Sequence, residues 1–167
     1  MQRTLISHAL LVVVLCLVAG AAIAGECKPI RAHAGTATYF DDCEYDGTTY
    51  LGCVETPIRG TLNGTWIFYY TLNNSVDLPA LPEDPWPGAG SSGWGLGVYK
   101  TNKGKVFAQE AWVSHWDLAP PVVDYYIFSG NSLITGGTRH WMGATGWLGF
   151  VGDEANGGVI RGEICTP

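Results

Sequence analysis

Two carboxylates, Glu110 and Asp124, lie in stretches with an apolar residue at every second position. On a strand, this pattern places each carboxylate on the same face as apolar side chains. Every second residue around each of them is apolar or aromatic, and alternate side chains of a strand share one face. Alternation therefore allows each of them to point into an apolar interior. Burial there raises the pKa of a carboxyl group, which can then act as a general acid or orient a ligand. The favoured interpretation is that each faces solvent or makes a structural hydrogen bond.

Other catalytic arrangements have weaker support. His115 lies in an irregular stretch over 114–121 and is a lesser candidate base, because a loop histidine is usually exposed. The chain has no Gly-x-Ser-x-Gly motif for an activated serine and no Cys-x-x-Cys pair for zinc. We therefore expect no metal and no cofactor. A binding protein is favoured over an enzyme, and an enzyme would be a cyclase or isomerase.

Aromatic side chains form a second group with chemical potential. Stretch 65–72 alternates aromatic residues on one face with apolar residues on the other, which predicts a strand covered on both sides. Stretch 73–92 holds four prolines and is expected to be a long loop at the mouth of the fold, with a tryptophan as its lid. These side chains either line a ligand cavity or fill the core. The candidate ligand-binding residues are Trp66, Phe68, Tyr70, Trp86, Trp112 and Tyr126.

The first 24 residues are typical of a secretory signal peptide. Arg3 precedes an apolar run over 9–22, and Ala22-Ile23-Ala24 supplies the small residues of a cleavage site. A membrane anchor is the alternative, but the run is short for a membrane span. We expect residues 1–24 to be removed and 25–167 to form one domain that is secreted or periplasmic. No membrane association is expected after cleavage.

Four cysteines remain once Cys16 leaves with the signal peptide. An even number in an exported chain predicts two disulfides, and four cysteines allow three pairings. We favour Cys43 with Cys53 as a local loop, and Cys27 with Cys165 as a clasp between the chain ends.

Charge excludes one class of partner. The net charge is −6, with 15 acidic residues against 9 Lys and Arg. Nucleic-acid binding needs the opposite balance, because phosphates attract cations. The chain is therefore not expected to bind nucleic acid.

Composition and turn spacing predict an all-β fold with little or no helix. Glycine numbers 23 and tryptophan 7, charged residues are only 14%, and no stretch shows helical periodicity. About eight hairpin-linked strands are expected, and closure into one antiparallel barrel removes their exposed edges. A sandwich is the alternative. The expected strands include 34–41, 48–56, 65–72, 93–101, 105–113, 122–128, 132–135 (after a turn at 129–131), 143–151 and 159–165.

The segment Ile134-Thr-Gly-Gly-Thr-Arg-His-Trp-Met-Gly-Ala-Thr-Gly146 resembles the Gly-Gly-Thr-Gly-Arg-Phe-x-Gly-Ala-x-Gly turn of the allene oxide cyclase barrel superfamily. That group includes plant dirigent proteins and small exported bacterial proteins. The resemblance covers mainly residues 93–165. Arg139 stands where the family has glycine, and His140 and Trp141 replace its Arg and Phe. An aromatic ring at 141 can fold inward and plug one end of the barrel.

The resemblance implies a calycin-like eight-stranded barrel with an apolar cavity, often assembled as a homotrimer. The family's activities are cyclisation of a fatty-acid epoxide and steering of phenoxy-radical coupling, and its functional residues do not match this chain position by position. We therefore expect an exported barrel that binds a small apolar or aromatic ligand. The alternatives are a cyclase, isomerase or dirigent-type enzyme, and a structural or interaction protein with a filled core.

Overall fold

The computed structural model describes residues 25–77, 89–117, 125–153 and 156–167. The predicted signal peptide at 1–24 lies outside them. Strands make up nearly all of this part of the chain, with one 3-10 turn. The elements are β1 (Glu26–Ala34), β2 (Thr38–Asp41), β3 (Glu44–Tyr45), β4 (Thr48–Thr49), β5 (Gly52–Gly60), β6 (Gly64–Asp77), β7 (Ala89–Thr101), β8 (Gly104–Asp117), β9 (Tyr125–Gly137), η1 (Arg139–Trp141), β10 (Thr145–Asp153) and β11 (Gly157–Thr166).

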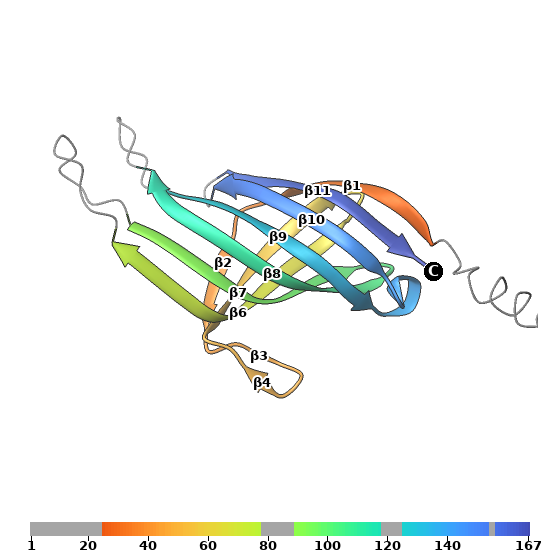
Figure 1. Cartoon of the computed structure of the whole chain (residues 1–167), viewed down its shortest axis with the longest axis horizontal. Coiled ribbons are helices and arrows are strands. Elements are labelled where there is room, and N and C mark those ends of the chain that lie inside the picture. Colours follow the sequence, from red (N-terminus) through yellow and green to blue (C-terminus); the bar gives the residue numbers. More distant parts are fainter. Residues whose placement is uncertain (1–24, 78–88, 118–124, 154–155) are drawn as a thin grey trace, which may run out of the picture.

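Eight of these strands close into an antiparallel barrel (Figure 1). Their order is β1-β11-β10-β9-β8-β7-β6-β5, and β1 then pairs with the last part of β5 to complete the ring. The first part of β5 pairs instead with β2, which follows β1 along the chain. The predicted barrel is therefore confirmed, and the sandwich alternative is wrong.

Both favoured disulfides are present. Cys27 and Cys165 are bonded and stand opposite each other in the β1–β11 pair, next to the two chain ends. Cys43 and Cys53 are bonded across the segment that holds β3 and β4. The first bond joins two strands that become neighbours only when the barrel closes. Two disulfides are typical of a protein that folds in an oxidising compartment.

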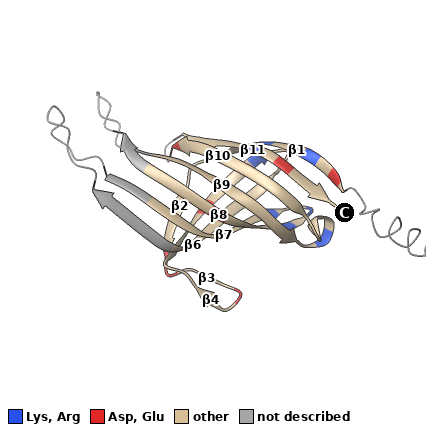
Figure 2. Cartoon of the chain, in the orientation of Figure 1, with Lys and Arg blue, Asp and Glu red and all other residues tan. Residues whose placement is uncertain are grey.

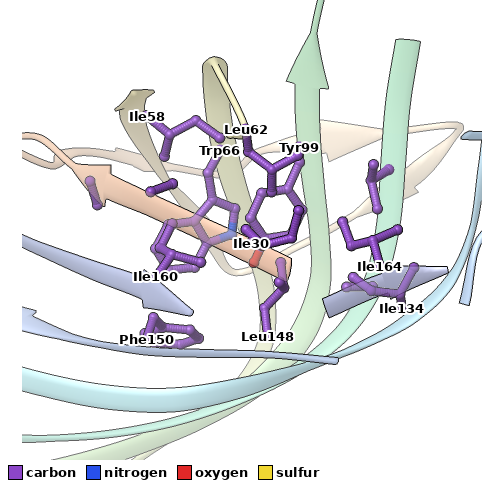
Figure 3. Close-up of a cluster of buried hydrophobic side chains, with 14 of the residues drawn as sticks. Ile30, Ile58, Leu62, Trp66, Tyr99, Ile134, Leu148, Phe150, Ile160 and Ile164 are labelled. Carbon is purple, nitrogen blue, oxygen red and sulfur yellow. The ribbon is translucent and has the colours of Figure 1, made fainter. Parts of the chain in front are cut away.

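The barrel interior is an apolar core built from alternate residues of every strand. Full burial of one large apolar side chain contributes about 1.5–3 kcal/mol, so these alternating positions hold the barrel together. Figure 3 shows ten of these side chains labelled where they converge from different strands. The buried cluster includes Ile30, Ala32, Ile58, Leu62, Trp66, Phe68, Tyr99, Val106, Ala108, Ile134, Leu148, Phe150, Ile160 and Ile164.

A second cluster lies on the outer face of the barrel, where the β3–β4 hairpin packs against it. Tyr45 and Tyr50 place their ring centroids 5.2 and 5.4 Å from that of Tyr69. Ile67 and Val98 are buried beneath the same cover. Stretch 65–72 is thus covered on both faces as predicted, because the Cys43–Cys53 bond holds the hairpin against β5.

One end of the barrel is closed by residues 134–146, the segment that resembles the turn of the allene oxide cyclase barrel superfamily. Trp141 at the end of η1 is buried in the core cluster, and its Nε1 donates to Oγ1 of Thr101 at 3.1 Å. The expected inward fold of this ring is confirmed. Arg139 has φ of 56°, a left-handed conformation that glycine adopts most easily. The position where the family has glycine therefore has a glycine-like backbone here.

Several predicted boundaries are wrong, most of them in the direction of too little strand. The turn expected at 129–131 does not exist, since β9 runs unbroken from Tyr125 to Gly137. The strand expected over 34–41 is divided, because β1 (which was not expected) ends at Ala34 and β2 covers only Thr38–Asp41. Strand β8 continues to Asp117 through the expected connection. The loop predicted for 73–92 is shorter, because β6 reaches Asp77 and β7 begins at Ala89. In β6, β7 and β9, pairing with neighbouring strands outweighs the weak strand propensity of Gly, Asn and Ser.

Candidate functional site

A buried carboxylate is the centre of a polar network inside the barrel. Glu110 is only 3% exposed, and its Oε1 accepts hydrogen bonds from the hydroxyls of Tyr99 at 2.7 Å and Ser132 at 2.6 Å. The indole Nε1 of Trp66 donates to both carboxylate oxygens, at 3.0 Å to Oε2 and 3.2 Å to Oε1. Tyr99 and Ser132 also lie 2.8 Å apart, hydroxyl to hydroxyl. The inward orientation that alternation allows for Glu110 is confirmed.

The register of four adjacent strands brings this network together. Trp66 on β6 stands opposite Tyr99 on β7, and Glu110 on β8 stands opposite Ser132 on β9. The space for the carboxylate comes from Gly97, because a Cβ atom there would overlap the Glu110 carboxyl group. The network is therefore built into the barrel wall, with one member on each of four strands.

Burial of Glu110 favours the protonated form of its carboxyl group. Loss of water raises the pKa of Glu110 from 4.5 to about 7, against the lowering effect of the hydrogen bonds from Ser132, Tyr99 and Trp66. Burial also raises the pKa of Tyr99 well above its ordinary value, and the nearby Glu110 charge raises it further. Tyr99 is thus a neutral donor, and Glu110 exchanges a proton near neutral pH.

Aromatic rings line the barrel interior beyond Glu110, on the side away from the Trp141 plug. Tyr70, Trp112 and Phe128 are only partly buried and pack against the core cluster. Phe68 contacts both Tyr70 and Trp112, with centroid distances of 6.1 and 6.4 Å and an edge-on geometry to Trp112. These four rings form what we call the aromatic end: Phe68, Tyr70, Trp112 and Phe128.

One polar atom of the aromatic end has no partner. Nε1 of Trp112 is buried and makes no hydrogen bond. It is the single buried side-chain nitrogen or oxygen with that property in the described part of the chain. Buried polar groups in native proteins are nearly always paired with protein or ordered water, so this N–H is a donor that requires an acceptor.

The predicted ligand-binding residues divide into two groups. Phe68, Tyr70 and Trp112 lie together at the aromatic end. Trp66 also points inward, but Glu110 already occupies its N–H. Asp124 and Trp86 lie outside the described residues. His115 and Tyr126 lie on β8 and β9, and their side chains also fall outside that part.

Three residues of the site were missed by sequence reasoning. Tyr99 and Ser132 complete the Glu110 network, and Phe128 joins the aromatic end. Gly97 and Tyr99 are two residues apart and share one face of the strand. A small residue beside an inward tyrosine is a pattern from which a buried polar site could have been predicted. Ser132 directly follows the expected turn at 129–131, so its position opposite Glu110 could not be inferred.

The described residues include no group of three or more His, Cys, Asp or Glu side chains arranged to hold a metal ion. Within the same ranges, no helix has the length and apolar character needed to span a bilayer. No protein-family model matches the chain, and no curated protein or solved structure matches it either. The proposals that follow therefore rest on the geometry and on the residue resemblance alone.

Proposed function

We propose that this protein is an exported, non-catalytic barrel that binds a small apolar or aromatic ligand at the aromatic end. The ligand carries one hydrogen-bond acceptor, which receives the Nε1–H of Trp112. The observation that carries the proposal is this buried donor without a partner, set beside the buried Phe68 and the partly buried Tyr70 and Phe128. An unpaired buried N–H costs about 1–3 kcal/mol, so an acceptor placed there gains roughly that amount in affinity.

The surrounding rings suit such a ligand. Phe68, Tyr70 and Phe128 offer apolar faces and edges, which favour flat or hydrophobic molecules over highly polar ones. Pockets that combine many apolar contacts with a few fixed polar groups are typical of small-molecule sites. The resemblance to the allene oxide cyclase barrel superfamily, whose members hold apolar cavities, supports the same proposal, as do the two disulfides for export.

Glu110 is proposed as a structural group of this binder. Its Oε1 accepts from Trp66, Tyr99 and Ser132, so that oxygen has no capacity left for a substrate. The rival function is a cyclase or isomerase that uses Glu110 as a general acid, and the pKa of about 7 is the observation in its favour. A Glu110→Gln variant separates the two, because a binder keeps its affinity and an enzyme loses turnover.

The experiment is a fluorescence titration with matched ligands. Aryl ketones such as acetophenone carry an acceptor, and alkylbenzenes such as ethylbenzene have the same ring without it. We expect the ketones to bind more tightly, and Trp112→Phe to abolish that preference while keeping hydrocarbon binding. Trp147→Phe is the control, since that ring is on the outer face and 52% exposed. Equal ketone preference in wild type and Trp112→Phe would contradict the proposal.

A further inference from the structure

The outer face of the barrel carries an open groove of about 920 Å³ that crosses strands β7 to β11. Most of its lining residues point outward, and Trp112 and Phe150 of the inner cluster also line it. Alternation places Ala111, Asn131 and Gly149 outward, in one continuous row of directly paired residues. The row begins at Trp94 on β7 and ends at Arg161 on β11. Four strand spacings of about 4.8 Å give this groove a span of roughly 19 Å.

Two tryptophans lie exposed in the groove. Trp94 is 55% exposed, and Trp147 beside the row is 52% exposed. A Cβ atom added at Gly149 would lie 3.8 Å from the Trp147 ring and 3.6 Å from Oδ1 of Asn131. The glycine therefore leaves a shallow floor between a flat aromatic ring and an amide. Large exposed tryptophans are unusual on a free surface and mark interaction sites when they gather in one patch.

The end of the row is basic. Arg161 stands opposite Arg31 on β1, and in the neighbouring row His33 stands opposite Arg59 on β5. Figure 2 shows blue and red segments close together on β1 and β11, beside the largely uncharged strands β9 and β10. Like charges placed directly across a strand pair repel each other, in a chain whose net charge is −6.

These arginines have no acidic partner in the described part of the chain. The single salt bridge there joins Lys28 and Glu26. Glu163 is the nearest acidic residue on the outer face of β11, two positions from Arg161, and no ion pair forms between them. A concentration of unpaired guanidinium groups on an acidic protein favours an anionic partner, because Arg binds carboxylate and sulfate groups bidentately.

We infer that this groove binds an acidic polysaccharide. Indole rings present flat faces on which the apolar faces of sugar rings stack, and the amide of Asn131 and the hydroxyl of Ser129 suit sugar hydroxyls. The guanidinium groups of Arg161 and Arg31 receive the carboxylate or sulfate groups of the chain. The groove is open and crosses the strands, so a polymer passes through it without a free end. Trp112 lines this groove as well as the aromatic end, so the two proposed sites share one residue.

The test is affinity electrophoresis and calorimetry with polygalacturonate, alginate, chondroitin sulfate and dextran sulfate. Methyl-esterified polygalacturonate and unsulfated dextran are the matched neutral polymers. We expect at least one acidic polymer to bind, its neutral form to bind about tenfold less, and added salt to weaken binding. Trp94→Ala, Trp147→Ala and Arg161→Gln should each weaken it about tenfold. Phe40→Ala and Lys103→Gln, both exposed and away from the groove, should leave it unchanged.

Three results would overturn this inference. The first is that none of the four acidic polymers binds. The second is binding that all three groove variants retain, which would point to general charge attraction. The third is self-association in sedimentation that Trp147→Ala abolishes, which would make a second copy of the chain the occupant. None of these variants changes a residue of the aromatic end, so ketone binding in the same preparations should be unchanged. Unchanged ketone binding serves as the control that each variant is correctly folded.

Discussion

Trp66 and Tyr99 stack face to face inside the barrel, with ring planes 3° apart and centroids separated by 5.8 Å. Figure 3 shows the two rings side by side within the buried cluster. Both donate to Glu110, so the stack holds two donors in fixed positions against one carboxylate. This arrangement makes the network rigid. It also requires the carboxyl group of Glu110 to be buried, whether it is protonated or charged.

The first prediction concerns the pH dependence of stability. The pKa of Glu110 is raised in the folded state, so its protonated form is favoured there. The stabilisation is complete below the unfolded pKa of 4.5 and is lost as pH rises through about 7. Relative to Glu110→Gln, wild type should lose about 3 kcal/mol of unfolding free energy across that window. Chemical denaturation from pH 4 to 8 measures it, and a constant difference between the two proteins would contradict it.

A glycine pair tests how tightly the carboxylate is enclosed. In Gly97→Ala the new methyl group would overlap the Glu110 carboxyl, so we expect a loss of about 2 kcal/mol in unfolding free energy. Gly149→Ala is the matched control on the outer face, where the added Cβ makes only ordinary contacts. Its effect should stay within about 0.5 kcal/mol. Equal effects of the two changes would show that the site near Glu110 is loosely packed.

The left-handed backbone at residue 139 gives a comparison of two variants. Arg139→Gly suits φ of 56°, whereas Arg139→Ala places a Cβ in the same unfavourable conformation. We expect the glycine variant to be more stable than the alanine variant by about 1 kcal/mol, in spite of the greater entropy of glycine in the unfolded chain. Thermal unfolding of both proteins measures this difference in stability. An alanine variant of equal or greater stability would mean that the turn adopts a different backbone conformation.

The two disulfides should contribute unequally. Cys27 and Cys165 are 138 residues apart along the chain, and Cys43 and Cys53 only 10. Chain entropy predicts a loss of about 5 kcal/mol for the double alanine variant of the first pair and about 3 kcal/mol for the second. The second change should also loosen the β3–β4 hairpin, which quenching of tyrosine fluorescence would detect. The reverse order of stability would argue that closure depends on strand pairing alone.

Much of the fold could be predicted because alternation and cysteine spacing are local signals. Glu110 and strand 65–72 were placed on the correct faces, since a period of two needs no knowledge of partners. The pairing of Cys27 with Cys165 was favoured as a clasp between the chain ends, and closure of the barrel makes their two strands neighbours. Trp141 could be assigned to the plug through the resemblance of its turn to that of the allene oxide cyclase barrel superfamily.

The parts that failed depend on long-range pairing. Stretch 129–131 has the composition of a turn, yet Gly130 is paired on both sides, with Trp112 and Phe150. No local pattern reports such partners. Ser132 acquires its role only because β8 and β9 align it with Glu110, and the β3–β4 hairpin is held in place by a disulfide and an aromatic cluster. Registers of this kind are set by the whole barrel.

The central claim is that the buried N–H of Trp112 receives the acceptor of a small ligand. Proton–nitrogen NMR measures this directly, because each of the seven tryptophans gives one indole signal and Trp112→Phe identifies the signal of Trp112 by its absence. Titration with acetophenone should move the Trp112 signal downfield more than any other, and ethylbenzene should shift it little. A Trp112 signal that stays fixed while other indole signals respond to bound ketone would contradict the account.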